Sequence, residues 1–275
     1  MNSIETNKLC AKIGDFELKD IDLQIPEGSI VGLIGRNGAG KTTLFKTLHG
    51  SYIKTSGDLK LSGLNYIDNE KEIRTNVAVV YDFFNGNPYA KVKWLRKIYV
   101  QSHPNFDLKL FDELIKRFNI DLKKRVSSLS LGMQKKLMLI LAISVHPTTL
   151  LLDEPLIGID PIDKQEFINI IQSYMENEKH SIIWSSHQID DVQKIADYIA
   201  FMNEGEIVLF EDKETLLDKY KMITLAENDR NSVILINPKS TPFGVQGLVR
   251  TKDLGKVAGK HNQASLEQIF VHLCA

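Results

Sequence analysis

Short apolar runs alternate with helical patterns along most of the chain. Residues 16–25 place apolar side chains at nearly every second position, which predicts a half-buried strand, and the continuously apolar run 29–35 predicts a buried one. A glycine-rich stretch, 35–43, then opens into a short helix that ends near Gly50. A strand, a glycine-rich loop and a helix in this order form a recognisable supersecondary unit.

The alternation continues further along the chain. It predicts strands at 76–84, 148–155 and 180–187, helices at 164–178 and 188–200, and a hairpin turning at 203–205. The run 148–155 is continuously apolar and leucine-rich, as in strands of a parallel sheet that are covered on both faces. Alternating strands and helices indicate an α/β fold.

Two regions depart from this alternation. Between about 86 and 147, apolar residues at three- and four-residue spacings predict a mainly helical insert. After residue 220 the pattern changes to two strands, 232–238 and 245–251, and a final helix, 265–273. We therefore predict a main domain over 1–220, with its helical insert, and a small C-terminal accessory region over 221–275. No internal repeat is evident.

Composition narrows the class of protein. The 275 residues are 43% hydrophobic and 25% charged, which excludes a mainly disordered chain, and the net charge of -1 provides no global field for nucleic acid, so no nucleic-acid partner is expected. Cys10 and Cys274 lie at opposite ends of the chain and have no metal-ligand spacing. Residues 1–15 are polar, and no apolar run reaches the roughly 20 residues of a membrane helix. We expect a cytoplasmic protein that reaches a membrane only through a partner.

The glycine-rich stretch carries the chemistry that is easiest to interpret. Gly35 to Thr42 match G-x-x-x-x-G-K-[ST], the Walker A pattern or P-loop. Glycines let the backbone turn its N–H groups toward phosphate oxygens, and the following helix presents its positive end to the same anion. Lys41 would reach the β and γ phosphates and the Thr42 hydroxyl would ligate Mg²⁺. The other residues expected to cradle the phosphates are Asn37, Gly38, Ala39, Gly40 and Thr43.

A second motif ends the apolar run near residue 150. Leu150 to Leu152 followed by Asp153 form a Walker B arrangement, in which Asp153 would hold the magnesium through water. On an extended backbone the next residue, Glu154, points to the opposite side, which suits a base that polarises the attacking water. Without the upstream phosphate loop, a solvated pair of carboxylates at a strand end would be the better interpretation.

With further motifs the sequence resembles the nucleotide-binding subunit of ATP-binding cassette (ABC) transporters. Leu129 to Met133, LSLGM, is similar to the LSGGQ signature of that family, Gly158 to Asp160 to its D-loop, and His187 to its switch histidine. The motifs stand in the family order, and the resemblance covers residues 13–210. It implies a P-loop NTPase fold with a mainly parallel sheet core, an antiparallel β-subdomain, the helical insert and the C-terminal appendage.

The resemblance also implies a mechanism and partners. Two such subunits, in a homodimer or a heterodimer, sandwich ATP and Mg²⁺ head to tail, so that Ser130 and Gly132 of one cap the γ phosphate held by Lys41 of the other. His187 would contact the γ phosphate and help to position Glu154, the expected catalytic base. Asp160 would contact the opposite subunit. A separate integral membrane permease would convert closure of the pair into transport.

Three positions depart from the family pattern. Ile13 stands where an aromatic residue usually stacks on adenine, and Phe16 is the nearest aromatic. Asp82 stands where the Q-loop glutamine is usual; a carboxylate can approach magnesium through water but cannot donate an amide hydrogen bond. The signature has Leu131 and Met133 in place of glycine and glutamine, while Ser130 and Gly132 remain.

The partner surface has two interpretations. Residues 86–130 carry ten Lys or Arg against four Asp or Glu, either as solvated helix faces or as a surface toward anionic lipid headgroups beside a membrane partner. An aromatic-rich segment in and before this region forms either a docking site for the permease or the core of the insert: Tyr81, Phe83, Phe84, Tyr89 and Trp94.

The leading hypothesis is an ATPase subunit of a bacterial ABC exporter of drugs or peptides, peripheral on the inner face of the cell membrane. The exporter assignment rests on analogy, because the signature, the insert and the last helix resemble exporter-type cassettes. The alternatives are a soluble ABC ATPase that remodels a cytosolic assembly, a nucleic-acid or ribosome-associated cassette, and a regulatory ATP-binding module. Glu154 and His187 argue against the last of these.

Overall fold

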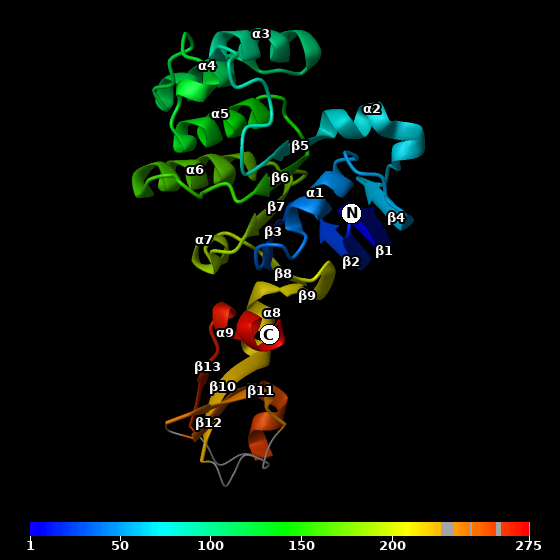
Figure 1. Cartoon of the computed structure of the whole chain (residues 1–275), viewed down its shortest axis with the longest axis vertical. Coiled ribbons are helices and arrows are strands. Elements are labelled where there is room, and N and C mark those ends of the chain that lie inside the picture. The colour runs from blue at the N-terminus through cyan, green and yellow to red at the C-terminus, as the bar shows by residue number, and fades with distance from the viewer. Residues whose placement is uncertain (227–233, 243, 257–259, 275) are drawn as a thin grey trace.

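A six-stranded sheet lies at the centre of the computed structural model, which describes residues 1–226, 234–242, 244–256 and 260–274 (Figure 1). Its order is β5-β6-β7-β3-β8-β9, and all neighbours are parallel except β8 and β9. The strands are β5 (Val77–Val80), β6 (Thr149–Asp153), β7 (Ser181–Ser186), β3 (Ile30–Gly35), β8 (Tyr198–Asn203) and β9 (Glu206–Asp212). The predicted α/β class with a mainly parallel core is confirmed.

Burial explains why the central strands are continuous apolar runs in the sequence. Every residue of β3, β6 and β7 is buried, because helices cover both faces of a parallel sheet. Since parallel strands end at the same edge, the loop after β3 and the residues that follow β6 and β7 meet there. The helices of this part are α1 (Lys41–Leu48), α2 (Tyr66–Asn76), α6 (Pro161–Tyr174) and α7 (Ile189–Gln193).

The antiparallel β-subdomain is a three-stranded sheet of order β2-β1-β4, made of β1 (Asn2–Ile13), β2 (Phe16–Pro26) and β4 (Ser56–Leu61). The hydrophobic pattern did not predict β1. Its register against β2 shifts between Thr6 and Leu9, and Lys8 has a φ of 46°, so the buried positions change phase within the strand. A β-bulge of this kind hides the period of two that reveals a strand in sequence.

The predicted helical insert is present and lies above the sheet in Figure 1. It contains α3 (Val92–Ser102), α4 (Leu108–Arg117), a short 3₁₀ helix η1 (Val126–Ser128) and α5 (Leu131–Ile143). Phe111 and Leu137 are fully buried in the apolar cluster that joins the insert to the sheet. Of the aromatic residues near this insert, Phe83, Tyr89 and Trp94 are exposed, so they do not form its core.

Two predicted elements of the main domain were wrong in extent. The helix predicted over 188–200 is only α7, and the chain from Tyr198 is strand β8. Asp197 explains why the helix ends early. Its N–H donates to Ile30 O (2.8 Å) and its carboxylate accepts from Ile30 N (2.8 Å), so the residues that follow Asp197 are held beside β3. The strand predicted over 76–84 is only β5, because its neighbour β6 pairs with it no further than Val80.

The C-terminal region extends away from the central sheet as a four-stranded antiparallel sheet of order β11-β12-β10-β13 (Figure 1). Its elements are α8 (Lys213–Lys219), β10 (Tyr220–Leu225), β11 (Ile236–Thr241), β12 (Gly244–Arg250), the 3₁₀ helix η3 (Thr251–Lys256), β13 (Lys260–Gln263) and α9 (Leu266–Leu273). Ser232 and Val233 of the strand predicted at 232–238 lie outside the described residues, and the observed strand is displaced, since β11 begins at Ile236 and ends at Thr241. Phe270 of α9 packs edge-on against Phe201 of β8, with 5.2 Å between the ring centroids. The C-terminal region and the central sheet therefore share one apolar core.

Within the described residues, no helix has the length and apolar character needed to cross a membrane.

Candidate functional site: a phosphate loop beside two carboxylates

The glycine-rich loop leaves the end of β3 and enters α1 at the sheet edge where parallel strands end. Gly38 (φ 85°) and Gly40 (φ 110°) adopt left-handed backbone conformations that glycine reaches without strain. Gly40 is the N-cap of α1 and offers no side chain to its first N–H groups, which therefore face the loop. The loop lines a cavity of about 310 Å³ together with Asp153 and Glu154. The predicted phosphate cradle therefore has the geometry of an anion site.

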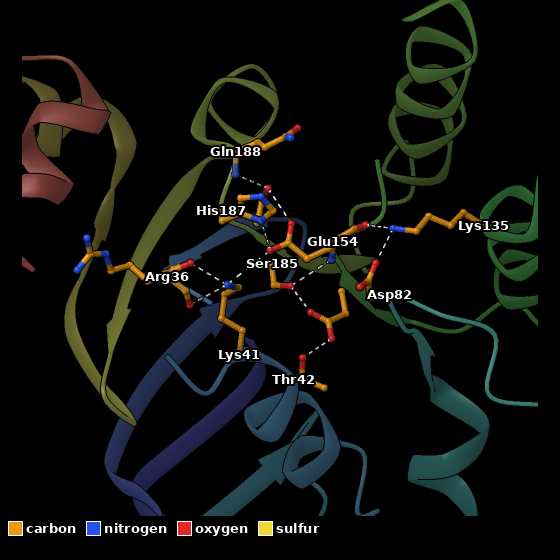
Figure 2. A network of polar contacts seen from close by, with 12 residues as sticks. Arg36, Lys41, Thr42, Asp82, Lys135, Glu154, Ser185, His187 and Gln188 are labelled. Atoms are coloured by element: carbon orange, nitrogen blue, oxygen red, sulfur yellow. Dashed lines mark hydrogen bonds and ion pairs between the residues drawn. The ribbon is translucent and has the colours of Figure 1, made fainter. Parts of the chain in front are cut away.

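Lys41 lies inside the wall of this cavity and is only 6% exposed. Its Nζ donates to the carbonyl oxygens of Gly35 (2.7 Å) and Arg36 (3.3 Å) and lies 3.5 Å from Glu154 Oε1 (Figure 2). A buried ammonium that contacts only oxygen atoms of the loop and one carboxylate is a fixed positive charge at the cavity. Such a charge can pair with a phosphate.

Asp153, at the end of β6, is 2% exposed and has both carboxylate oxygens engaged. Thr42 Oγ1 donates to Oδ2 and Ser185 Oγ donates to Oδ1, each at 2.6 Å. A threonine hydroxyl and a carboxylate in contact are hard oxygen donors, the type that Mg²⁺ prefers when it is shared with a bound phosphate. The residues present therefore fit a magnesium ion between Thr42 and Asp153.

Glu154 does not have the extended backbone expected from the sequence. Its φ is 48°, a left-handed conformation that is uncommon for residues other than glycine. Within this turn its N–H donates to the carbonyl oxygen of Ser185 (3.2 Å), so β7 holds the residue in place. The correction matters because the turn, and not strand alternation, aims the Glu154 side chain.

The last residue of β7, Ser186, and the next residue, His187, hold the Glu154 carboxylate. His187 Nδ1 lies 2.9 Å from Oε1, and Ser186 Oγ donates to Oε2 at 3.2 Å (Figure 2). A carboxylate can only accept, so in this contact Nδ1 of His187 carries the hydrogen. The Glu154 side chain is 10% exposed, and its Oε1 thus faces both the histidine and the Lys41 ammonium. A base that is oriented by a second group has the arrangement required for proton transfer.

Asp82 stands on the cavity wall, beyond the end of β5. Its Oδ1 accepts from Lys135 Nζ of α5 at 2.8 Å, so one of its oxygens already has a cationic partner. The predicted contact of Asp82 with magnesium stays a prediction.

The remaining predicted residues divide into two groups. Phe16 lines the cavity, and its ring packs against Gly40, whereas Ile13 packs against the core beneath the antiparallel sheet and is not among the lining residues. Which of the two contacts adenine stays a prediction. Ser130 and Gly132 lie at the start of α5 and do not line this cavity.

Four residues that contact the site had not been singled out from sequence. Arg36 lines the cavity, Ser185 and Ser186 hold the two carboxylates, and Lys135 contacts Asp82 and Glu154. The serines carried a usable signal, since two polar residues end an apolar strand directly before His187. Nothing in the sequence indicated a role for Lys135, because a lysine on a helix is usually exposed.

Comparison with known proteins places this geometry in a family. A family model described as ABC transporter matches residues 18–157. The chain is 31% identical over 237 residues to the ABC transporter ATP-binding protein YtrB of Bacillus subtilis, covering 84% of this chain and 80% of that protein. It is 33% identical over 219 residues to the lantibiotic transport ATP-binding protein SrtF of Streptococcus pyogenes, covering 78% and 93%.

The fold also matches solved structures. One is described as a dimeric structure of a post-hydrolysis state of the ATP-binding cassette MJ0796 bound to ADP and Pi, with a TM-score of 0.67 and 19% identity. The match covers 76% of this chain and 98% of that one. At this identity the likeness establishes the fold, a P-loop NTPase of the ATP-binding cassette type.

Proposed function

The chain belongs to the ABC transporter family as an ATP-binding subunit, and from this premise we propose that it hydrolyses ATP at the cavity beside Lys41 and drives a separate membrane subunit. The observation that carries the proposal is the position of Glu154. Its carboxylate lies between the Lys41 ammonium (3.5 Å) and His187 Nδ1 (2.9 Å) at the edge of the cavity lined by the phosphate loop.

Each residue has a definite task in this proposal. The N–H groups of the loop and the Lys41 ammonium bind the β and γ phosphates, as charge-assisted donors do. Glu154 accepts a proton from the attacking water, and His187 keeps its carboxylate aimed at that water. Mg²⁺, when bound by Thr42 and Asp153, neutralises charge on the phosphate oxygens.

A second subunit completes the site in the proposal. Ser130 caps α5 by accepting from Met133 N (3.2 Å), and Gly132 follows on the same exposed turn, away from the cavity of its own chain. A helix start with a small hydroxyl residue and a glycine is an anion site that can approach phosphate closely. We therefore propose that Ser130 and Gly132 contact the γ phosphate bound by the other subunit, with Asp160 at the same contact. The second subunit is either the same chain or a different ATPase.

The membrane subunit and the export of a drug or peptide rest on the relatives. SrtF is named a lantibiotic transport protein, and we extend that class of peptide cargo to this chain. The exposed side chains of Phe83 and Tyr89, which stand between Asp82 and α3, and of Trp94 in the first turn of α3 provide aromatic anchors for a permease. The small sheet and α9 of residues 221–275 form an accessory region in this proposal.

A cationic patch beside these aromatics supports a position at the inner face of the cell membrane. The start of α3 runs alongside the segment before η1, since Val92 N donates to Lys124 O (3.0 Å) and Lys93 N to Leu122 O (2.9 Å). Neither segment supplies an acidic partner to the exposed cations, which form no ion pair with any described residue. They are Lys91, Lys93, Lys97, Lys123, Lys124 and Arg125. Six unpaired cations beside exposed aromatics suit anionic headgroups.

Trapping the closed state tests the proposal. Glu154→Gln keeps the shape of the side chain but removes the base, so the variant is expected to bind ATP and to lose hydrolysis. When the variant is expressed in the native cell with ATP present and extracted in mild detergent, mass spectrometry is expected to find an integral membrane protein in stoichiometric amount. Normal hydrolysis by Glu154→Gln contradicts the catalytic assignment. A trapped complex that contains only soluble partners contradicts the transporter assignment and favours an ATPase that remodels a cytosolic assembly.

A further inference from the structure

Lys135 of α5 is a fully buried lysine, with 0% of its surface exposed. A lysine is rarely buried, because removing its ammonium from water is costly unless acceptors replace the lost hydration. The acceptors that surround this ammonium therefore indicate what the residue does.

Two acceptors contact Nζ of Lys135, and each follows a strand of the central sheet. Asp82 Oδ1, beyond β5, lies at 2.8 Å and the main-chain oxygen of Glu154, directly after β6, lies at 2.5 Å (Figure 2). Since β5 and β6 are parallel neighbours, their ends lie side by side, and Lys135 of α5 reaches a residue that follows each of them. One ammonium thus joins α5, which Ser130 caps, to the wall of the nucleotide cavity and the proposed base.

The contact with Glu154 involves the strained part of the site. Glu154 has a φ of 48°, and a glutamate keeps a left-handed backbone only where its surroundings hold it there. Its N–H is held by Ser185, and its carbonyl oxygen accepts from Lys135 at 2.5 Å and from Ile157 N at 3.4 Å. The donor on the short contact is a charged ammonium, which makes the stronger hydrogen bond. The same turn directs the carboxylate toward Lys41 and His187.

We infer that Lys135 is a positioning residue for Glu154: its buried ammonium holds the left-handed turn that aims the carboxylate, and Asp82 balances its charge. This inference rests on the proposed role of Glu154 as the base. Lys135 does not itself line the cavity, so it acts on the rate of hydrolysis through Glu154 and leaves nucleotide binding intact. Asp82, whose side chain is 53% exposed, connects the pair to the cavity wall.

The neighbouring residue provides a matched control. Lys136 is also buried, at 6% exposed, and lies on the same helix, but its ammonium pairs with Asp163 of α6 and lies over the ring of Phe118. Removing either ammonium leaves a carboxylate without its partner, so both variants are expected to lower the stability of the fold. Of these two lysines, Lys135 contacts Glu154 and Lys136 does not.

The experiment compares Lys135→Met and Lys136→Met in the full chain, measuring kcat, KM and the Kd of ATP with thermal unfolding as the check on folding. We expect kcat of Lys135→Met to fall at least about tenfold, as displacement of a catalytic group does, with Kd within about twofold of the native value. Lys135→Arg, which keeps the charge and a donor, is expected to restore part of kcat. Lys136→Met is expected to keep kcat within about twofold. A native kcat in Lys135→Met, or an equal loss in both variants, overturns the inference.

Asp82→Asn covers the case in which Lys135→Met fails to fold. Because Asp82 is half exposed, this variant is expected to fold, to lower kcat and to leave unchanged the Mg²⁺ concentration that gives half-maximal rate. A changed magnesium requirement assigns Asp82 to the metal and overturns the inference, as does an unchanged kcat. Absence of hydrolysis in the native protein contradicts the proposed function instead, so the two failures are distinguishable.

Discussion

Thr42 Oγ1 donates a hydrogen bond of 2.6 Å to Asp153 Oδ2, although 111 residues separate the two in the chain. The contact joins the first turn of α1 to the end of β6, where we propose that a magnesium ion binds. We expect Thr42→Val to raise the Mg²⁺ concentration for half-maximal ATPase rate by about tenfold or more, because it removes a proposed ligand of the ion. Thr42→Ser, which keeps the hydroxyl, is the control. A magnesium titration that gives the same midpoint for all three proteins contradicts the site.

Phe16 and Ile13 are the two candidates for the contact with adenine. Phe16 lines the cavity and Ile13 does not, so Phe16→Ala is expected to raise the Kd of ATP about fivefold, the equivalent of roughly 1 kcal/mol of stacking. Ile13→Ala is expected to lower stability with little change in Kd. Fluorescence titration with a labelled ATP analogue measures both. A larger rise in Kd for Ile13→Ala than for Phe16→Ala would assign the adenine contact to Ile13.

Pairing of two subunits depends on Ser130 in the proposed function. Ser130→Asp keeps an acceptor for Met133 N at the helix start, so the thermal stability of the single subunit is expected to stay near the native value. The added carboxylate repels the partner's γ phosphate, and ATP-driven pairing in the Glu154→Gln background is expected to disappear. Ser128→Asp, two residues earlier, controls for charge alone. Light scattering with and without ATP gives the result, and dimers of Ser130→Asp at native yield contradict the contact.

The two cysteines are expected to differ in reactivity. Burial raises the pKa of the Cys274 thiol from 9.0 to about 11, and the residue is 8% exposed. Since only the thiolate reacts, the pKa shift alone slows alkylation at pH 8 by about a hundredfold. Cys10, which is partly exposed, is expected to react first in the folded protein. Peptide mass spectrometry after timed iodoacetamide labelling measures both rates, and equal rates before unfolding contradict the packing of α9.

Asp107 caps α4, and its stabilising effect is expected to depend on pH. The N–H of Leu110 donates to its carboxylate at 2.9 Å and holds the pKa of Asp107 below its ordinary 3.8. A carboxylate whose pKa is lowered by folding stabilises the protein above its unfolded pKa, and this stabilisation is lost as the pH falls through the folded value. Asp107→Ala is expected to lower the free energy of unfolding at pH 7 by about 1 kcal/mol, and Asp107→Asn by less. Denaturant titrations at pH 7 and pH 3.5 test this, and a pH-independent difference contradicts it.

Local sequence was sufficient for much of this protein. The glycine spacing from Gly35 to Thr42, the apolar run before Asp153 and the position of His187 predicted a phosphate site, its carboxylates and the α/β class, because each motif is a short stretch whose backbone geometry follows from its own residues. The helical insert was also predictable, since its apolar residues keep one period over several turns.

The tertiary structure decided the features that depend on distant neighbours. Strand β1 was not predicted because a bulge changes its burial phase, and the end of α7 was not predicted because Asp197 pairs with Ile30, 167 residues away in sequence. The left-handed turn at Glu154 and the burial of Lys135 could not be read from sequence either. Both depend on which chain segments lie together at the ends of β5, β6 and β7. The sequence by itself determined which residues we expect to carry the chemistry, whereas packing between distant segments determined how the proposed base is aimed.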